Sequence, residues 1–530
     1  MFTCDFSCSR MLGNELAVYR RDPSLDEVEA ANAEIARQEQ AVTAIELQIQ
    51  NLISEIAKLR TRQRTHRDVV HRCKGVITLA RRIPEELLAK IFEHCIADGW
   101  TRAPIVVSHV CSAWRKAAMA PRVWSHIYLD ANSIDALGRT RFWLRRARHA
   151  PLHITIVASW HTPHTQLADT IGLLRRRASQ WESIRLFIDG LAIAHFALSN
   201  FTQPMPQLRE VDIQAQLQED GDSDEQFTLA DTFTEEVAPV LSELRFSCNV
   251  LPSVLKAPAH IKSLTLDIRE SPVSHPLSNV ALVDLLEGLS QLESLTVQLP
   301  LVYEAQLVNE DPERVVDLSR LSSLTIYGPT DLNSLLLHLR AQNLRELHLR
   351  SVDGEGQGLE PIGPTLLHFL NKSLPSLELL ELHDIDLSPE TFEACFWALP
   401  DLHALRLHES SISADTIKLL TGRSAMCPRL THLDLRWCSR LDGKALVDLV
   451  RERQLPSVGD DGDVRMACGS EIAVEPIAEI SILNCCHVGE QDVLQLARMT
   501  TVRLSVREDD YCRKWYISQI QVTCLRYPAH

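Results

Sequence analysis

Residues 82–129 read RIPEELLAKIFEHCIADGWTRAPIVVSHVCSAWRKAAMAPRVWSHIYL, and the rest of the chain is organised around them. The spacing of their apolar residues predicts three short helices. The first helix would present one apolar face made of Pro84, Leu87, Leu88, Ile91 and Phe92. The second repeats that spacing with Val107, Val110, Cys111 and Trp114, and Pro121 begins the third. Because about 50 residues bury little surface alone, we expect this unit to pack against another part of the chain.

The stretch resembles the F-box, whose motif runs Leu-Pro-x-Glu-Leu-Leu-x-x-Ile-Phe, then Val-Cys-x-x-Trp-Arg, then Pro-x-Leu-Trp. The matching residues are Pro84, Glu86, Leu87, Leu88, Ile91, Phe92, Val110, Cys111, Trp114, Arg115, Pro121 and Trp124. Ile83 and Val123 stand where leucine is usual and keep the apolar volume. The alternative is a three-helix unit that only packs.

The resemblance implies docking onto a Skp-type adaptor protein and, through it, onto a cullin. The residues it places at that interface are Pro84, Leu87, Leu88, Ile91, Phe92, Val110, Cys111 and Trp114. The sequence does not separate those that would contact the adaptor from those that would form the core of the F-box itself.

Composition limits the class of protein. The chain has 530 residues, 45% of them hydrophobic, and a net charge of −16, which argues against nucleic acid as a partner. The 14 cysteines form no CxxC pairs, which is typical of reduced thiols in an intracellular protein. With no signal-peptide pattern and no apolar run of 18 residues, we expect a cytoplasmic or nuclear protein without a membrane segment.

A heptad pattern precedes the F-box-like stretch. From Val28 to Ile77, apolar residues recur at alternating steps of three and four, with Gln38, Gln63 and His66 interrupting them. This predicts a coiled-coil helix over residues 24–80, after a disordered N-terminus at 1–23. We expect a homodimer through residues 28–59; the alternative is a helix folded back on its own chain.

A second theme, Leu-x-x-Leu-x-Leu, recurs after residue 180 at intervals of about 20 to 47 residues. Its copies begin at Leu208, Leu241, Ile261, Leu292, Leu321, Leu344, Leu377, Leu402, Leu430 and Ile477, and Trp181 begins a weaker one. They resemble leucine-rich repeats, so the expected fold class is α/β, with a solenoid and its curved parallel sheet over residues 151–510. The F-box would occupy 81–130, a linking helix 131–150 and a tail 511–530.

Alternation along the repeat strands places polar side chains opposite the buried leucines. The candidate substrate-binding residues on this polar face are Arg345, His348, Glu381, Arg406 and Asp434. A mixed, charged face suits a protein surface or peptide better than an apolar small molecule. The alternative is that these residues are only the solvated side of the strands.

No catalytic motif stands out, and we expect no catalytic residue, metal or cofactor. Cys485, Cys486 and His487 could imitate a nucleophile and base, but adjacent side chains point apart and Cys485 fits a buried turn cysteine of the repeats. The order coiled coil, F-box, repeats looks like large F-box families of mushroom-forming fungi. This resemblance implies the substrate-recognition subunit of a Skp–cullin–F-box ubiquitin ligase, not an enzyme. The alternative is a scaffold that recruits no ligase.

Overall fold

The computed structural model describes residues 22, 24–77, 82–159, 161–215, 226–229, 231–248, 254–268, 279–298, 314–328, 333–351, 362–421, 426–454 and 474–504. The segments predicted as a disordered N-terminus and a C-terminal tail lie outside these residues, apart from Asp22. The chain divides into two compact units, Met1–Leu88 and Ala89–His530. Among the described helices, none combines the length and the apolar character that crossing a bilayer requires.

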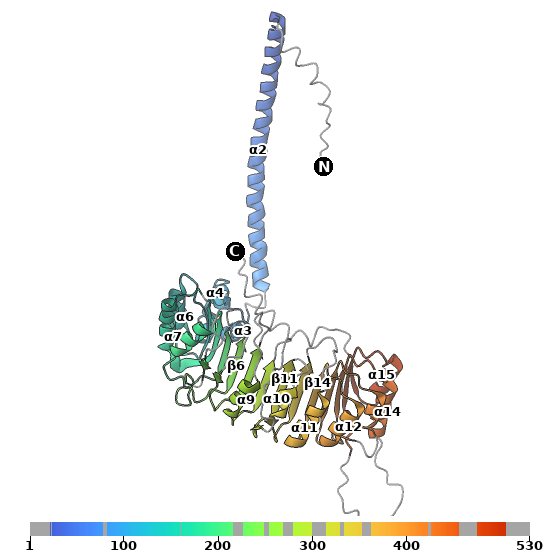
Figure 1. The fold of residues 1–530 in the computed structure, drawn as a ribbon. Helices are drawn as coiled ribbons and strands as arrows, with labels where there is room; N and C mark the ends of the chain where they lie inside the picture. The colour runs from blue at the N-terminus through green and yellow to red at the C-terminus, as the bar shows by residue number, and fades with distance from the viewer. Residues whose placement is uncertain are drawn as a thin grey trace, which may run out of the picture. The chain divides into compact units, whose positions relative to one another are not determined.

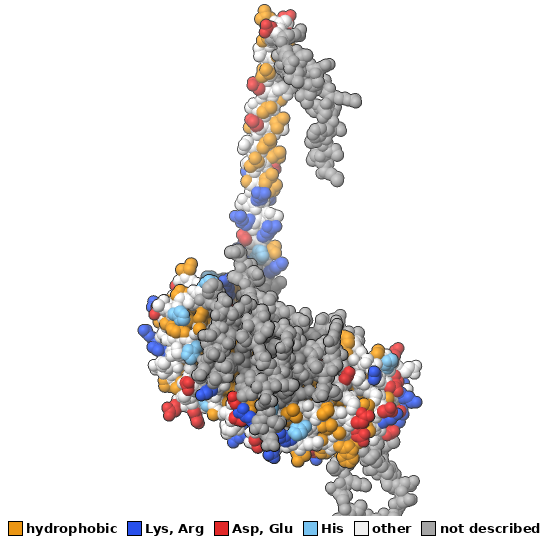
Figure 2. Space-filling view, viewed as in Figure 1, with side chains coloured by type: hydrophobic (Ala, Val, Ile, Leu, Met, Phe, Trp, Pro, Cys, Tyr) orange, Lys and Arg blue, Asp and Glu red, His pale blue; other side chains and the backbone are white. Residues whose placement is uncertain are grey.

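The first unit consists mainly of one long helix, α2 (Leu25–Ile77). Its start is fixed by a capping box, in which the Glu27 N–H donates to Ser24 Oγ and the Ser24 N–H donates to the Glu27 carboxylate, at 3.3 and 2.9 Å. Apolar side chains along the helix are exposed, and Figure 2 shows them as an orange band along α2. The predicted long helix is confirmed, whereas its partner stays a prediction.

The second unit contains a 14-stranded sheet in the order β1-β2-β3-β4-β6-β8-β9-β11-β13-β14-β15-β16-β17-β18 (Figure 1). Each described strand pairs in parallel with its neighbour, so the predicted parallel sheet is confirmed. The strands are β1 (His126–Asp130), β2 (Leu152–Ala158), β3 (Trp181–Ile188), β4 (Glu210–Ala215), β6 (Glu243–Cys248), β8 (Ser263–Ile268), β9 (Ser294–Gln298), β11 (Ser323–Gly328), β13 (Glu346–Ser351), β14 (Leu379–His383), β15 (Ala404–His408), β16 (His432–Arg436), β17 (Glu479–Leu483) and β18 (Thr501–Leu504).

Helices form a second layer, in which successive helices contact each other from α6 to α8 and from α9 to α15 (Figure 1). They are α6 (Ala136–Ala147), α7 (His164–Arg175), α8 (Leu191–Ser199), α9 (Asn279–Glu287), α10 (Asn333–Leu337), α11 (Gly363–Ser373), α12 (Pro389–Ala398), α13 (Ala414–Lys418), α14 (Gly443–Gln454) and α15 (Glu490–Ala497), with a 3-10 turn η3 (Ala178–Gln180). Two short pairs, β5 (Gln226–Thr228) with β7 (Val254–Lys256) and β10 (Val316–Asp317) with β12 (Leu339–Arg340), complete the described elements of this unit outside residues 82–125.

The core lies between the sheet and the helices and is filled by the Leu-x-x-Leu-x-Leu copies. In β16, Leu433 and Leu435 are buried whereas Asp434 between them is half-buried on the opposite face, as predicted. Leu405 pairs with Leu433 across neighbouring strands, so the leucines stack in continuous rows. No copy could bury its leucines alone, which is why the strands stack in chain order.

The turns after the last strands repeat one conformation. Asp384, Glu409, Trp437 and Asn484 each follow a strand directly and have φ between 52° and 58°, in the left-handed region. The N–H groups of the first three donate to the last carbonyl of the next strand, at 2.7 to 2.9 Å. The residue after each left-handed position is buried: Ile385, Ser410, Cys438 and Cys485. The burial predicted for Cys485 is therefore confirmed, and the thiols of Cys438 and Cys485 donate to strand carbonyls.

The sheet begins earlier than the predicted boundary at residue 151. β1 belongs to the F-box-like stretch, yet its five residues pair with β2. Helix α6 reinforces the junction, because Trp124 packs edge-on against Phe142 and Trp143, and the Arg146 guanidinium lies 5.1 Å from the Trp124 ring centre. The predicted linking helix thus packs against the F-box-like stretch.

Candidate protein-interaction site

The F-box-like stretch folds into four short helices: α3 (Glu85–Ala97), α4 (Ala103–Ser108), α5 (Ser112–Ala117) and the 3-10 turn η2 (Pro121–Trp124). Pro104 lies in the first turn of α4, where its missing N–H leaves no donor unpaired. Cys111 caps α5, because its Sγ accepts from the Trp114 N–H at 3.5 Å. The indole N–H of Trp124 donates to the Ala118 carbonyl at 2.6 Å and ties η2 to the end of α5.

The single apolar face predicted for the first helix is divided in two. Leu88 and Phe92 are 2% and 1% exposed and belong to the core, where the Phe92 ring lies 5.1 Å from that of Trp114. Leu87 and Ile91 are 56% and 45% exposed and lie one turn apart on the other side of α3. The eight predicted adaptor-binding residues therefore differ in their access to a partner.

The remaining predicted residues also divide. Val110 is 57% exposed and Pro84 is exposed, whereas Cys111 and Trp114 are half-buried. The structure adds two apolar residues that the sequence reasoning missed, Ile105 and Val106 on α4, which are 38% and 44% exposed. Their signal was present, since Ile105, Val106 and Val107 are consecutive and a six-residue helix cannot bury all three.

Four accessible aliphatic side chains of this stretch lie in the second unit. They are Ile91, Ile105, Val106 and Val110, which we call the apolar set. Leu87, Trp100 and Met119 are exposed as well. Aliphatic side chains with no reactive group can bind a partner but cannot carry out chemistry. Figure 2 shows hydrophobic side chains exposed at the end of the molecule where Figure 1 labels α4 and α6. Among the described residues, no cluster of three or more His, Cys, Asp or Glu could hold a metal ion.

The predicted substrate-binding residues lie side by side on the polar face of the sheet. His348, Glu381, Arg406 and Asp434 occupy one register row across β13, β14, β15 and β16. Glu381 Oε2 accepts from the His348 ring at 3.1 Å and from the Arg406 guanidinium at 3.2 Å. Arg345 lies just before β13 and pairs with Glu378 at 3.3 Å, outside the row. The row thus links three strands through charged hydrogen bonds.

The second carboxylate of the row is held in the same way. Asp434 accepts two hydrogen bonds from Arg436, both at 2.8 Å, and lies 3.8 Å from the His408 ring. Burial alone would raise the pKa of Asp434, but the nearby His408 ring and the hydrogen bonds from Arg436 outweigh it and lower the pKa to about 2. Both carboxylates are therefore ionised at neutral pH and neutralise part of the arginine charge on this face.

The Glu381 contacts predict a dependence of stability on pH. Burial would raise the pKa of Glu381, but hydrogen bonds from His348 and Arg406 lower it from 4.5 to about 2. A lowered folded-state pKa means that this stabilisation is present above pH 4.5 and is lost as the pH falls toward 2. Glu381→Gln should therefore remove roughly 2 kcal/mol at pH 7 and make unfolding less sensitive to pH between 5 and 3. Urea denaturation at pH 7, 5 and 3 measures the free energy of unfolding of the wild type and the variant and tests this.

The control for this experiment is Glu378→Gln, because Glu378 is about half exposed and its ion pair with Arg345 is screened by solvent. We expect that variant to keep the pH dependence of the wild type. Equal pH dependence in the wild type and Glu381→Gln would contradict the assignment.

Comparison with known proteins agrees with the motif. Residues 80–130 match the family model described as F-box-like. Comparison with curated proteins gives no match for the chain. The matched segment covers α3 to β1, and it marks a protein-interaction adaptor of the kind found in ubiquitin-ligase complexes.

Proposed function

We propose that this chain is the substrate-recognition subunit of a Skp–cullin–F-box ubiquitin ligase, in which the F-box-like stretch docks onto a Skp-type adaptor. One observation carries the proposal: the segment that matches the F-box-like family exposes the apolar set on α3, α4 and the turn after α4. A partner that covers such aliphatic side chains stabilises the complex by about 25 cal/mol per Å² of apolar surface removed from water.

The polar sheet face is the proposed substrate surface. Support comes from its mixed charge and from the adjacent positions of His348, Glu381 and Arg406. The regular strand order and the repeated left-handed turns support a leucine-rich-repeat solenoid, whose exposed sheet face is a binding surface. The long helix α2 supports self-association through residues 28–59, since its heptad side chains are exposed.

The adaptor prediction is tested by Ile91→Asp combined with Val110→Asp. Both side chains are about half exposed, so the fold should survive, whereas two carboxylates in an apolar contact should weaken binding at least a hundredfold. Co-purification of the full chain with a Skp-type adaptor measures this, and circular dichroism checks the fold.

Matched controls are Lys90→Asp and His109→Asp, which place the same carboxylate on exposed polar neighbours of the two sites. Binding of both controls and loss of binding by the double variant would support the proposal. Undiminished capture of the adaptor by a folded double variant would reject the proposed interface. Absence of adaptor binding by the wild type would favour a scaffold that recruits no ligase.

A further inference from the structure

The long helix α2 carries a heptad seam along its length, and none of the side chains of residues 25–75 is buried. Counting Val28 as position a, the a positions are Val28, Ile35, Val42, Ile49, Ile56, Gln63 and Val70. The d positions are Ala31, Gln38, Ile45, Leu52, Leu59, His66 and Cys73. Six of the seven a positions hold β-branched residues and two of the seven d positions hold leucine, so the apolar side chains form the narrow a/d stripe that one partner helix covers. The seam therefore fits one further helix of the same kind.

The charge of α2 is divided between its halves. Residues 25–50 contain six acidic and one basic residue, and residues 51–77 contain seven basic and two acidic residues, so the halves carry −5 and +5. Figure 2 shows the Lys and Arg side chains gathered toward one end of α2. Two such helices side by side attract each other when they run in opposite directions and repel when they run in the same direction.

The polar interruptions of the seam select one antiparallel register. When residue i faces residue 101 − i, every a position faces a d position, as antiparallel packing requires. Gln38 then faces Gln63, so each of the two glutamines meets a hydrogen-bonding partner, while Val42 faces Leu59 and Ile49 faces Leu52. In the single helix, Gln38 donates to Glu34 at 2.7 Å, a bond that solvent or Gln63 can replace.

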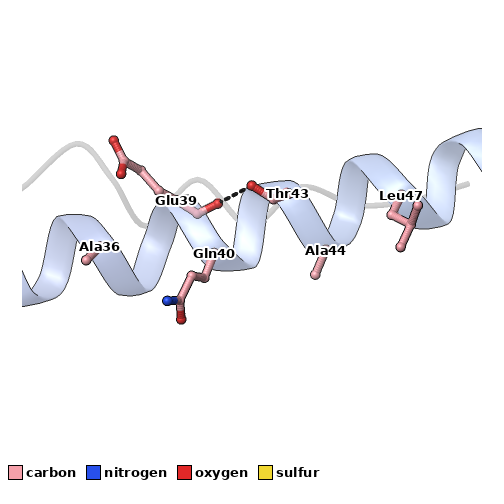
Figure 3. A pocket seen from close by; sticks show the side chains of 6 residues that line it. All are labelled: Ala36, Glu39, Gln40, Thr43, Ala44 and Leu47. Carbon is pink, nitrogen blue, oxygen red and sulfur yellow. Dashed lines mark hydrogen bonds between the residues drawn. The ribbon is translucent and has the colours of Figure 1, made fainter.

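Flanking charges favour the same register. In it, Glu39 of each copy lies beside Arg60 of the other copy, which gives two such pairs, since e positions neighbour e positions in antiparallel pairs. In a parallel pair, Glu39 would lie beside Glu34 and Arg62 beside Arg67, and these two repulsive contacts outnumber the attractive one between Glu55 and Arg60. Figure 3 shows the Glu39 side chain extending from α2, while its backbone carbonyl accepts from Thr43 at 2.8 Å.

We propose that α2 forms an antiparallel two-stranded coiled coil with a second copy of this chain, centred between residues 50 and 51. The inference rests on the proposed self-association and adds its direction and register. The two helices then form a rod of about 80 Å, with the C-terminal end of each copy's α2 at opposite ends. Each copy continues from that end toward its own F-box-like stretch.

Charge reversal distinguishes the two directions without relying on cysteine chemistry. In the antiparallel register, Glu39→Arg faces Arg60 and Arg60→Glu faces Glu39, so each full-length variant alone should dissociate on the order of tenfold more readily. A mixture of the two variants restores both pairs in the heterodimer. Sedimentation equilibrium of each variant, and capture of untagged Arg60→Glu by tagged Glu39→Arg, measure these effects.

The control is Glu29→Arg, which changes the charge equally at an outward b position and should leave dimerisation unchanged. Weak homodimers with a preferred heterodimer support the proposal. Tighter association of Glu39→Arg than of the wild type would establish the parallel direction and overturn it. A wild-type monomer at all concentrations would reject self-association altogether, and a trimer would reject the two-stranded seam. Adaptor co-purification is independent of all these outcomes, so failure here leaves the ligase proposal intact.

Discussion

Arg453→Met is expected to lower the free energy of unfolding by about 3 to 5 kcal/mol. Arg453 lies in the last turn of α14 with a side chain that is 4% exposed, and burial lowers its pKa to about 10, so it stays charged at neutral pH. Its guanidinium donates to five backbone carbonyls, those of Leu420, Met426, Cys427, Leu430 and Glu475. Methionine would fill the volume but leave these buried acceptors without a donor.

Urea denaturation of the full chain, followed by circular dichroism, measures the loss. Arg451→Met is the matched control, because Arg451 lies on the same helix, about half exposed, in an ion pair with Asp448. That change should alter the free energy of unfolding by less than about 0.5 kcal/mol. Similar denaturation midpoints for the two variants would show that the carbonyl contacts of Arg453 do not stabilise the sheet.

The second large effect is expected within α3, where truncating one residue should lower stability and truncating its neighbour should weaken adaptor binding. Phe92→Ala removes a buried ring that packs against Trp114 and should cost about 3 to 5 kcal/mol of stability. Ile91→Ala removes an exposed side chain, so it should cost under about 1 kcal/mol but weaken adaptor binding. Denaturation and adaptor titration on the same samples measure both quantities.

Each variant serves as the control for the other, since both truncate an apolar residue of the same helix to alanine. A stable Phe92→Ala variant would mean that the F-box-like core tolerates a cavity at this position. An Ile91→Ala variant with full adaptor affinity would remove Ile91 from the proposed interface.

The repeat strands could be predicted because their signal is redundant. Every Leu-x-x-Leu-x-Leu copy places two residues on the same face of a strand, and the structure buries both, as in Leu380 and Leu382. Stacking then fixes the order of strands without further information. The row of His348, Glu381 and Arg406 followed from the same alternation, although their mutual hydrogen bonds did not.

Other structural features could not be predicted from the spacing of residues in the sequence. Leu87 and Leu88 are the same residue type at adjacent positions, and only the packing of α3 decides which of them is buried. In the sequence, Arg453 looks like an ordinary basic residue in the last turn of a helix. The carbonyls that accept its hydrogen bonds belong to segments 22 to 33 residues away in sequence. β1 was missed because only Ile127 and Leu129 are buried in it, too short a pattern to separate from the preceding motif.

The shared strand β1 has a consequence for domain exchange. A chimera that cuts the chain after residue 130 would take β1 away with the F-box-like stretch and leave the edge of β2 without its hydrogen-bonding neighbour. Cutting before His126 would leave Trp124 without its aromatic neighbours Phe142 and Trp143. Inserting one residue between Trp124 and His126 would turn the side chains of Ile127 and Leu129 to the opposite face of the sheet. The F-box-like stretch and the parallel sheet are thus exchangeable only as one piece.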